Sequence, residues 1–107
     1  MEIERTDDAD VIELKVVGEL TIFGAAEAYG FLTRALSERR DLRVNLAQVS
    51  EVDSSGVQLL LGAKRAAEKQ GHSFELVAHS EAMLEVMELL QLSHVFGDPL
   101  VMPAQAV

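Results

Sequence analysis

Two neighbouring hydroxyl side chains and a carboxylate offer the most distinctive chemistry in the sequence. They lie in the segment Asp53-Ser54-Ser55-Gly56, between Val52 and the apolar run that begins at Val57. This position predicts the end of a strand and the start of a helix. The first backbone N–H groups of a helix lack partners within it, and the helix dipole favours negative charge there. A hydroxyl at this point can cap the helix, or it can carry a phosphate that the N–H groups would stabilise.

The residues around the serines leave two interpretations open. Ser54 could support a plain capping turn without a regulatory role, because Ser and Asp are common caps. Gly56 would let the backbone of a partner approach closely. Val57, Leu60 and Leu61 could supply apolar contacts to such a partner. They could also pack in the core, since a helix of this kind buries one face.

Other kinds of chemistry find little support. His72, His79 and His94 fall on separate expected elements or turns, without the spacing of metal ligands. No glycine precedes the serines at the spacing of a nucleophile elbow, and the glycine-rich phosphate loop with its lysine is absent. The chain has no cysteine, so thiolate metal sites and disulfides are excluded. We therefore expect a protein that is not an enzyme and holds neither a cofactor nor a metal.

Composition restricts the partners. The chain has 107 residues, the size of one domain, and a net charge of −9 without a basic stripe. This charge argues against nucleic acid and against anionic lipid heads as partners. No segment reaches the roughly 20 apolar residues of a membrane span, and the start of the chain does not resemble a secretory signal. We expect a single cytoplasmic domain over residues 1–107, a monomer or weak dimer, with its core over about 2–97 and an irregular tail over 98–107.

The elements that must position the serines follow from hydrophobic periodicity. Alternation predicts strands over 2–6, 11–17, 42–46 and 74–78, with Gly18 closing the second and a further short strand at 95–96. Residues 48–52 either continue extended or turn once. Helical spacing predicts helices over 25–40, 55–70 and 81–90, the last with Met83, Val86, Met87 and Leu90 inward. Gly71 and Ser80 are expected as a helix stop and a helix cap.

The order of these elements indicates the fold class and the place of the site. Strands that alternate with helices imply a parallel or mixed sheet with helices packed against it. In such sheets, sites lie where the carboxyl end of a strand meets the next helix. The junction over residues 52–57 is such a place.

Four segments of the sequence together resemble a known family. They are Gly18-Glu19-Leu20, residues 44–61 with Asp-Ser-Ser-Gly among them, residues 71–77 and residues 89–97. This combination resembles the STAS domain family of bacterial anti-sigma factor antagonists, over roughly residues 2–97. The resemblance implies an α/β fold, with a small mixed β-sheet of four to five strands and about three to four helices packed mainly on one side.

The resemblance also implies a signalling switch. In the antagonists, a serine kinase that doubles as an anti-sigma factor phosphorylates the second serine of the motif, here Ser55. The unmodified domain binds the kinase and releases sigma, phosphorylation breaks the complex, and a phosphatase resets it. A phosphate adds a charge of about −1.5 to −2 in the middle of the contact surface. The implied partner-binding residues are Asp53, Ser54, Ser55, Gly56, Val57, Leu60 and Leu61.

The identity of the partner is left open by the sequence. The family often has Asp after Gly-Glu-Leu and Asp in the strand before the motif, where this chain has Thr21 and Asn45. The segment 18–22 also resembles STAS proteins encoded beside chemotaxis-type histidine kinases, whose partner need not be an anti-sigma factor. The alternative function is an accessory subunit that binds the ATPase of a lipid-transport ABC transporter. In those relatives the serine of the motif is commonly threonine, so the two serines favour signalling.

Overall fold

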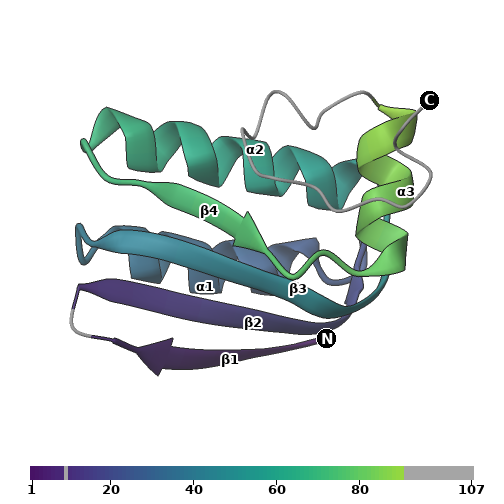
Figure 1. The fold of residues 1–107 in the computed structure, drawn as a ribbon, viewed down its shortest axis with the longest axis horizontal. Helices are drawn as coiled ribbons and strands as arrows, with labels where there is room; N and C mark the ends of the chain where they lie inside the picture. The colour runs from purple at the N-terminus through teal and green to yellow at the C-terminus, as the bar shows by residue number, and fades with distance from the viewer. Residues whose placement is uncertain (9, 91–107) are drawn as a thin grey trace.

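The computed structural model describes residues 1–8 and 10–90, which form four strands and three helices (Figure 1). In chain order the elements are β1 (Glu2–Asp7), β2 (Val11–Leu20), α1 (Ala25–Leu36), β3 (Asp41–Val52), α2 (Ser54–Lys69), β4 (Phe74–Val77) and α3 (Glu81–Leu89). The expected order of strands and helices is confirmed.

The strands form one mixed sheet in the order β1-β2-β3-β4. β1 runs antiparallel to β2, whereas β2, β3 and β4 are parallel to one another. The last residues of β2 and β3, Leu20 and Val52, are partners in the register. Because parallel strands end at the same edge, the loop before α1 and the start of α2 are brought together there.

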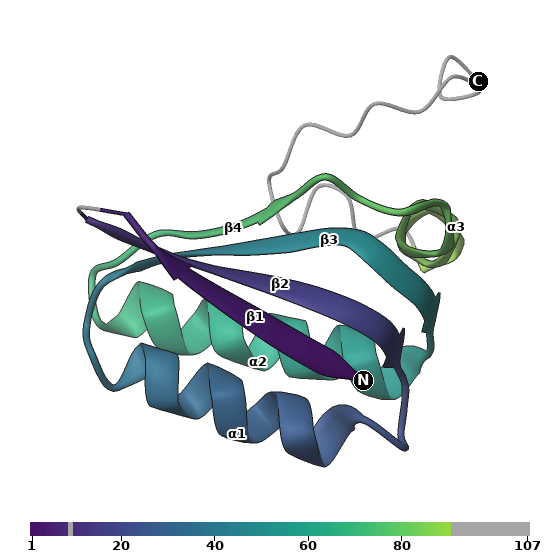
Figure 2. The ribbon, with the colours of Figure 1, turned by 90° about the horizontal axis from the view of Figure 1, so that it is seen from below.

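The core lies between the sheet and the two longer helices, α1 and α2, which cover one face of the sheet (Figure 2). Alternate side chains of the central strands are buried in it, as the two-residue period predicts. These side chains are Ile12, Leu14, Val16, Leu42, Val44 and Leu46. Each buried aliphatic side chain of this size contributes about 1.5–3 kcal/mol to folding.

α3 lies beside the C-terminal end of β3, on the other side of that strand from α2 (Figure 2). Its Met83 and Met87 are fully buried in the core cluster. The hydroxyl of Ser80 accepts a hydrogen bond from the Met83 backbone N–H at 3.2 Å, so the expected cap of this helix is confirmed. Leu90 was expected to point inward but is 44% exposed, because the helix ends at Leu89 and Leu90 is its C-cap.

β2 extends further than the sequence predicts, and β3 takes the extended course, one of the two that the sequence left open for residues 48–52. Gly18 does not close β2, which continues to Leu20 through two register shifts. Gly18 has a φ of +106°, a backbone conformation that residues with a Cβ atom rarely adopt. This conformation lets the strand bend and continue to pair. The segments 42–46 and 48–52 belong to one continuous strand, β3, with an extra residue after Asn45. The Oδ1 atom of Asn45 accepts a hydrogen bond from the Ala47 N–H at 3.0 Å and so supports this irregularity.

The C-terminal end of α1 differs from the predicted one, whereas the C-terminal end of α2 agrees with the prediction. α1 ends at Leu36 and not at Arg40, because Arg39 lies in the left-handed region with a φ of 54° and breaks the helical path. Gly71 follows the C-cap of α2 with a φ of +80°, and the His72 N–H donates to the Ala67 carbonyl at 3.0 Å. The expected glycine stop is therefore confirmed.

An exposed network of charged side chains joins the edge strand β1 to the far end of α1. Arg5 donates to the carboxylates of Asp7 at 2.9 Å and Glu38 at 2.8 Å. Arg40 donates to Asp7 at 3.0 Å and to the Asp8 carbonyl at 2.7 Å. β1 buries little of its side-chain surface, so this network supplements its backbone pairing with β2.

Some expectations fall outside the described residues. They are the strand at 95–96, the irregular tail over 98–107 and any role of His94. Among residues 1–8 and 10–90, none of the helices is both long enough and apolar enough to cross a membrane.

Candidate functional site

Asp53 forms the junction between β3 and α2. It is the N-cap of α2, with extended backbone angles, and its Oδ1 atom accepts a hydrogen bond from the Gly56 backbone N–H at 3.2 Å. Its carbonyl oxygen accepts the Val57 N–H at 3.1 Å. The cap of this helix is thus a carboxylate, whereas the sequence left open that a serine hydroxyl provides it. Both serines lie inside the first turn, because the helix begins at Ser54.

The same carboxylate reaches across to the loop that follows β2. Its Oδ2 atom accepts a hydrogen bond from the Ile22 backbone N–H at 3.1 Å. The Ile22 N–H, and next the Gly56 N–H, hold the pKa of Asp53 below its usual range by stabilising the charged form. The site therefore carries a fixed negative charge at neutral pH.

Ser54 and Ser55 follow this charged residue in the first turn of α2. Ser54 is exposed and Ser55 is half-buried. No acidic side chain lies in the first turn of α2, so the N-cap Asp53 supplies the negative charge at the start of this helix. The structure thus brings Asp53, Ser54 and Ser55 together at the surface, at the carboxyl edge of the sheet.

Gly56 has an internal role that differs from the one expected. A Cβ atom at this position would lie 2.2 Å from the Leu20 carbonyl oxygen and 2.9 Å from the Leu20 Cγ atom. The close approach that requires glycine is therefore between α2 and the end of β2. Gly56 is itself buried against the strand, and its expected role toward the backbone of a partner stays a prediction.

The apolar residues named as partner contacts lie in the core. Val57 and Leu60 are each 1% exposed and Leu61 is 7% exposed. Of the two interpretations that the sequence left open for them, core packing is the one observed. These three side chains pack α2 against the sheet. At the start of the helix, the side chains that reach the surface are therefore those of the serines.

The loop over residues 21–24, here called the Ile22 loop, completes the site. The sequence pointed to Thr21 as a departure from the family pattern, but Ile22 and Phe23 were not identified as part of the site. Thr21 is buried, and its Oγ1 atom accepts the Phe23 N–H at 3.3 Å. The Gly24 N–H donates to the Thr21 carbonyl at 2.9 Å. Ile22 and Phe23 are 66% and 92% exposed. The available signal was an apolar pair before a glycine, outside the periodic pattern of either neighbouring element.

We call residues 20–24 and 53–56 together the Asp53 corner. The two positions at which the family often has Asp have different structural roles in this chain. Thr21 belongs to the corner and provides an acceptor to its own loop. Asn45 lies earlier on β3 and supports the irregularity of that strand.

Comparison with known proteins identifies the family. The family model described as "Mlab, STAS domain" matches residues 1–102. The chain belongs to the STAS domain family. Anti-sigma-B factor antagonist of Staphylococcus epidermidis is 31% identical over 99 residues, which cover 89% of this chain and 92% of that protein.

Solved structures of STAS proteins share the fold. An anti-sigma factor antagonist from Mycobacterium paratuberculosis has a TM-score of 0.84 at 20% identity, over 94% of this chain and 86% of that one. The anti-sigma factor antagonist SpoIIAA in its unphosphorylated form has a TM-score of 0.74 at 20% identity, over 98% and 92% of the two chains. Bacillus SpoIIAA in its phosphorylated form matches with a TM-score of 0.69 at 21% identity, over 98% and 96%. These likenesses confirm the expected STAS-type α/β fold.

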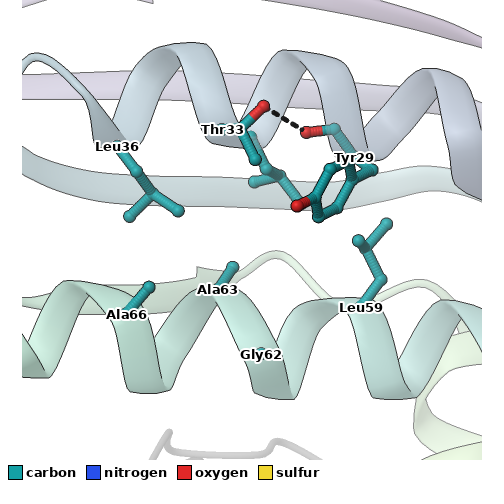
Figure 3. A pocket seen from close by; sticks show the side chains of 8 residues that line it. Tyr29, Thr33, Leu36, Leu59, Gly62, Ala63 and Ala66 are labelled. Atoms are coloured by element: carbon teal, nitrogen blue, oxygen red, sulfur yellow. Dashed lines mark hydrogen bonds between the residues drawn. The ribbon is translucent and has the colours of Figure 1, made fainter.

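A groove of this STAS domain lies between α1 and α2. It has a volume of about 220 Å³, and in it Tyr29 of α1 and Leu59 of α2 point toward each other (Figure 3). Its other lining residues are small or apolar apart from Thr33, whose hydroxyl donates to the Tyr29 carbonyl at 2.9 Å. Apart from the phenol of Tyr29, the lining offers no group commonly used in acid–base catalysis.

Metal-ligating groups do not gather in the part of this STAS domain that the structure describes. No set of three His, Cys, Asp or Glu side chains able to hold a metal ion occurs within residues 1–8 and 10–90. His72 lies 3.4 Å from Asp41 at the start of β3, and His79 lies between β4 and α3. Neither belongs to the Asp53 corner.

Proposed function

We propose that this STAS domain is a non-catalytic signalling switch in the cytoplasm, which binds a regulatory protein through the Asp53 corner and releases it when Ser55 is phosphorylated. The partner class is an anti-sigma factor with serine kinase activity, or another signalling protein such as a chemotaxis-type component. The observation that carries the proposal is the position of Ser55. It lies half-buried in the first turn of α2, two residues after the charged cap Asp53.

The chemistry of such a switch is simple at this place. The Ser55 Oγ atom would attack the γ-phosphorus of ATP in the active site of the kinase. A P–Oγ bond forms, the bond from the γ-phosphorus to the bridging oxygen breaks, ADP leaves, and the hydroxyl proton passes to a base of the kinase. The domain itself needs only to present the hydroxyl.

The effect on binding follows from charge. A phosphate on Ser55 adds about −1.5 to −2 charges at neutral pH. The neighbouring Asp53 carboxylate stays ionised, because the N–H groups of Ile22 and Gly56 lower its pKa. A partner that covers the corner would have to desolvate two adjacent anions, and this desolvation is costly without matching cations. The complex is therefore expected to dissociate on phosphorylation.

The relatives support the same class of function. The curated relatives are anti-sigma-B factor antagonists, and the match spans nearly the whole length of the Staphylococcus epidermidis protein. SpoIIAA, which has the same fold, exists in an unphosphorylated and a phosphorylated form. Both serines of the motif are present in this chain, with Ser55 in the second position.

A capture experiment tests the proposal. The tagged full chain, its Ser55→Asp variant and a Ser37→Asp control are used to retain proteins from the source cells. Ser37 is exposed at the end of α1, the opposite end from the Asp53 corner, so the control adds the same charge away from the proposed interface. We expect wild type and Ser37→Asp to retain a kinase or signalling protein that Ser55→Asp fails to retain.

Two other outcomes would contradict the switch. A partner retained equally by all three proteins would mean that the serines serve only the helix start. Retention of an ABC ATPase would favour the alternative, a transporter accessory subunit. Circular dichroism of each variant checks that a loss of binding is not a loss of fold.

A further inference from the structure

The Ile22 loop carries an exposed apolar pair that the fold does not need. Phe23 is 92% exposed, the highest fraction among the exposed large hydrophobic residues of the described chain, and Ile22 beside it is 66% exposed. A single exposed apolar side chain is ordinary, but two adjacent ones at the tip of a loop form a small projecting patch. Neither belongs to the core cluster, so core stability does not explain them.

The backbone beneath this pair is held in place. The Ile22 N–H donates to Asp53, the Phe23 N–H donates to the Thr21 hydroxyl, and the Gly24 N–H donates to the Thr21 carbonyl. Gly24 also lies close to β2, since a Cβ atom there would be 2.8 Å from the Glu19 carbonyl oxygen. A loop ordered before binding loses less conformational entropy when it binds. An aromatic side chain presented on such a support has the features of an interface hot spot.

The surroundings of the pair are acidic. Glu19 and Glu51 are register partners at the ends of β2 and β3, and both are exposed. Glu27 lies in the first turn of α1, and the Asp53 carboxylate lies beneath Ile22. The patch is therefore apolar with negative charge around it. The complementary surface is an apolar pocket bordered by arginine or lysine.

We infer that Ile22 and Phe23 form the apolar anchor of the partner interface, inserting into a hydrophobic pocket of a protein partner whose rim is basic. The inference rests on the proposed function, because it assigns these residues to the same partner-binding corner. A second copy of this chain fits less well, since each copy would bring its own acidic groups to the contact. An anionic lipid surface is disfavoured for the same reason.

The anchor also explains why Asp53 is placed where it is. Its two carboxylate oxygens hold the start of α2 and the backbone of Ile22 at once. The anchor and Ser55 are thereby kept in one fixed arrangement. A partner that takes up Phe23 is brought over Ser55, where an added phosphate would act on it.

Photo-crosslinking in the source cells tests the inference on the full chain. Benzoylphenylalanine is incorporated at position 23 and, as a matched control, at position 29, since Tyr29 is an exposed aromatic residue on α1. We expect adducts from position 23, well above those from position 29, to a protein of different sequence. The crosslinked peptide should contain an apolar segment flanked by arginine or lysine. Adducts to a second copy, adducts to lipid, or no excess over position 29 would each overturn the inference.

Two further measurements separate this inference from the proposed switch. The crosslinked protein is purified and titrated with the chain. We expect Phe23→Ser to weaken its affinity about tenfold or more, and Tyr29→Ser to leave it within about twofold. An equal effect of both variants would contradict the anchor. If the position 23 adduct persists in a Ser55→Asp background, the anchor stands and the phosphorylation switch fails.

Discussion

The carboxylate of Asp53 accepts a hydrogen bond from the backbone N–H of Ile22, 31 residues earlier in the chain, at 3.1 Å. The same side chain caps α2 through the Gly56 N–H. One residue thus ties a helix start to a loop from another part of the chain. The position of Ser55 relative to the exposed pair Ile22 and Phe23 depends on this double contact.

Replacing Asp53 is therefore expected to cost more than the loss of a cap. Asp53→Ala removes the acceptor for two backbone N–H groups, whereas Ser80→Ala removes the acceptor for one, at the start of α3. Loss of a cap alone costs about 0.5–2 kcal/mol. We expect the midpoint of urea unfolding to fall further for Asp53→Ala than for Ser80→Ala. Equal midpoints would mean that the bond to Ile22 adds nothing to stability.

The charge of Asp53 should appear in the pH dependence of stability. Its pKa in the folded protein is lowered, first by the Ile22 N–H. The stability it contributes is therefore present above the unfolded pKa of about 3.9 and is lost as the pH falls through the lower folded value. Asp7, Glu38 and Asp41 also have lowered pKa values, so wild type alone does not isolate the effect.

The comparison with Asp53→Asn isolates it, because Asn cannot ionise. We expect wild type to be more stable than Asp53→Asn at neutral pH. This difference in unfolding free energy should stay constant above about pH 5 and shrink below about pH 4. Urea unfolding at a series of pH values measures it. A difference that does not change on acidification would show that the carboxylate charge is not what holds the corner.

Two helix glycines should respond in opposite directions to alanine. Gly56→Ala would bring a Cβ atom to 2.2 Å from the Leu20 carbonyl oxygen. Because both α2 and β2 present backbone at this contact, one of the two elements would have to shift. We expect a loss of about 1–3 kcal/mol or more, as for overpacking in a core. Gly62→Ala meets nothing within 4 Å and should gain up to about 1 kcal/mol from helix propensity. A neutral Gly56→Ala variant in chemical unfolding would contradict the close contact between α2 and β2.

Arg5 should govern how firmly β1 is held. Arg5→Gln removes the bonds to Asp7 and Glu38 that connect this edge strand to the end of α1. We expect faster amide hydrogen exchange in β1, with the effect shrinking in about 1 M salt, since the network is exposed and screened. Arg43→Gln is the matched control, because Arg43 pairs with Glu13 and Glu75 on other strands. Unchanged exchange in β1 would mean that the backbone pairing with β2 suffices.

The parts of the fold that the sequence predicts are those set by local patterns. The alternation of Ile12, Leu14 and Val16 marks the buried face of β2, and Ser80 and Gly71 mark helix ends by their own chemistry. The junction at Asp53 was located for the same reason. In each case the residue and its structural partner are close in sequence or share one element.

The parts that the sequence did not predict depend on contacts between distant segments. Gly18 by itself is a plausible strand end, but β2 continues beyond it because Glu19 and Leu20 still pair with β3. Gly56 is glycine because of Leu20, a neighbour that only the sheet register brings near. The bond from Ile22 to Asp53 and the exposure of Phe23 likewise follow from the tertiary arrangement.

The central claim is that negative charge at Ser55 controls the binding of a protein partner. The most direct test is the dissociation constant of the purified partner for wild type, Ser55→Asp and Ser37→Asp, by titration calorimetry. We predict that Ser55→Asp raises the dissociation constant about tenfold or more, or about 1.4 kcal/mol, and that Ser37→Asp leaves it unchanged. Equal dissociation constants for wild type and Ser55→Asp would contradict the account.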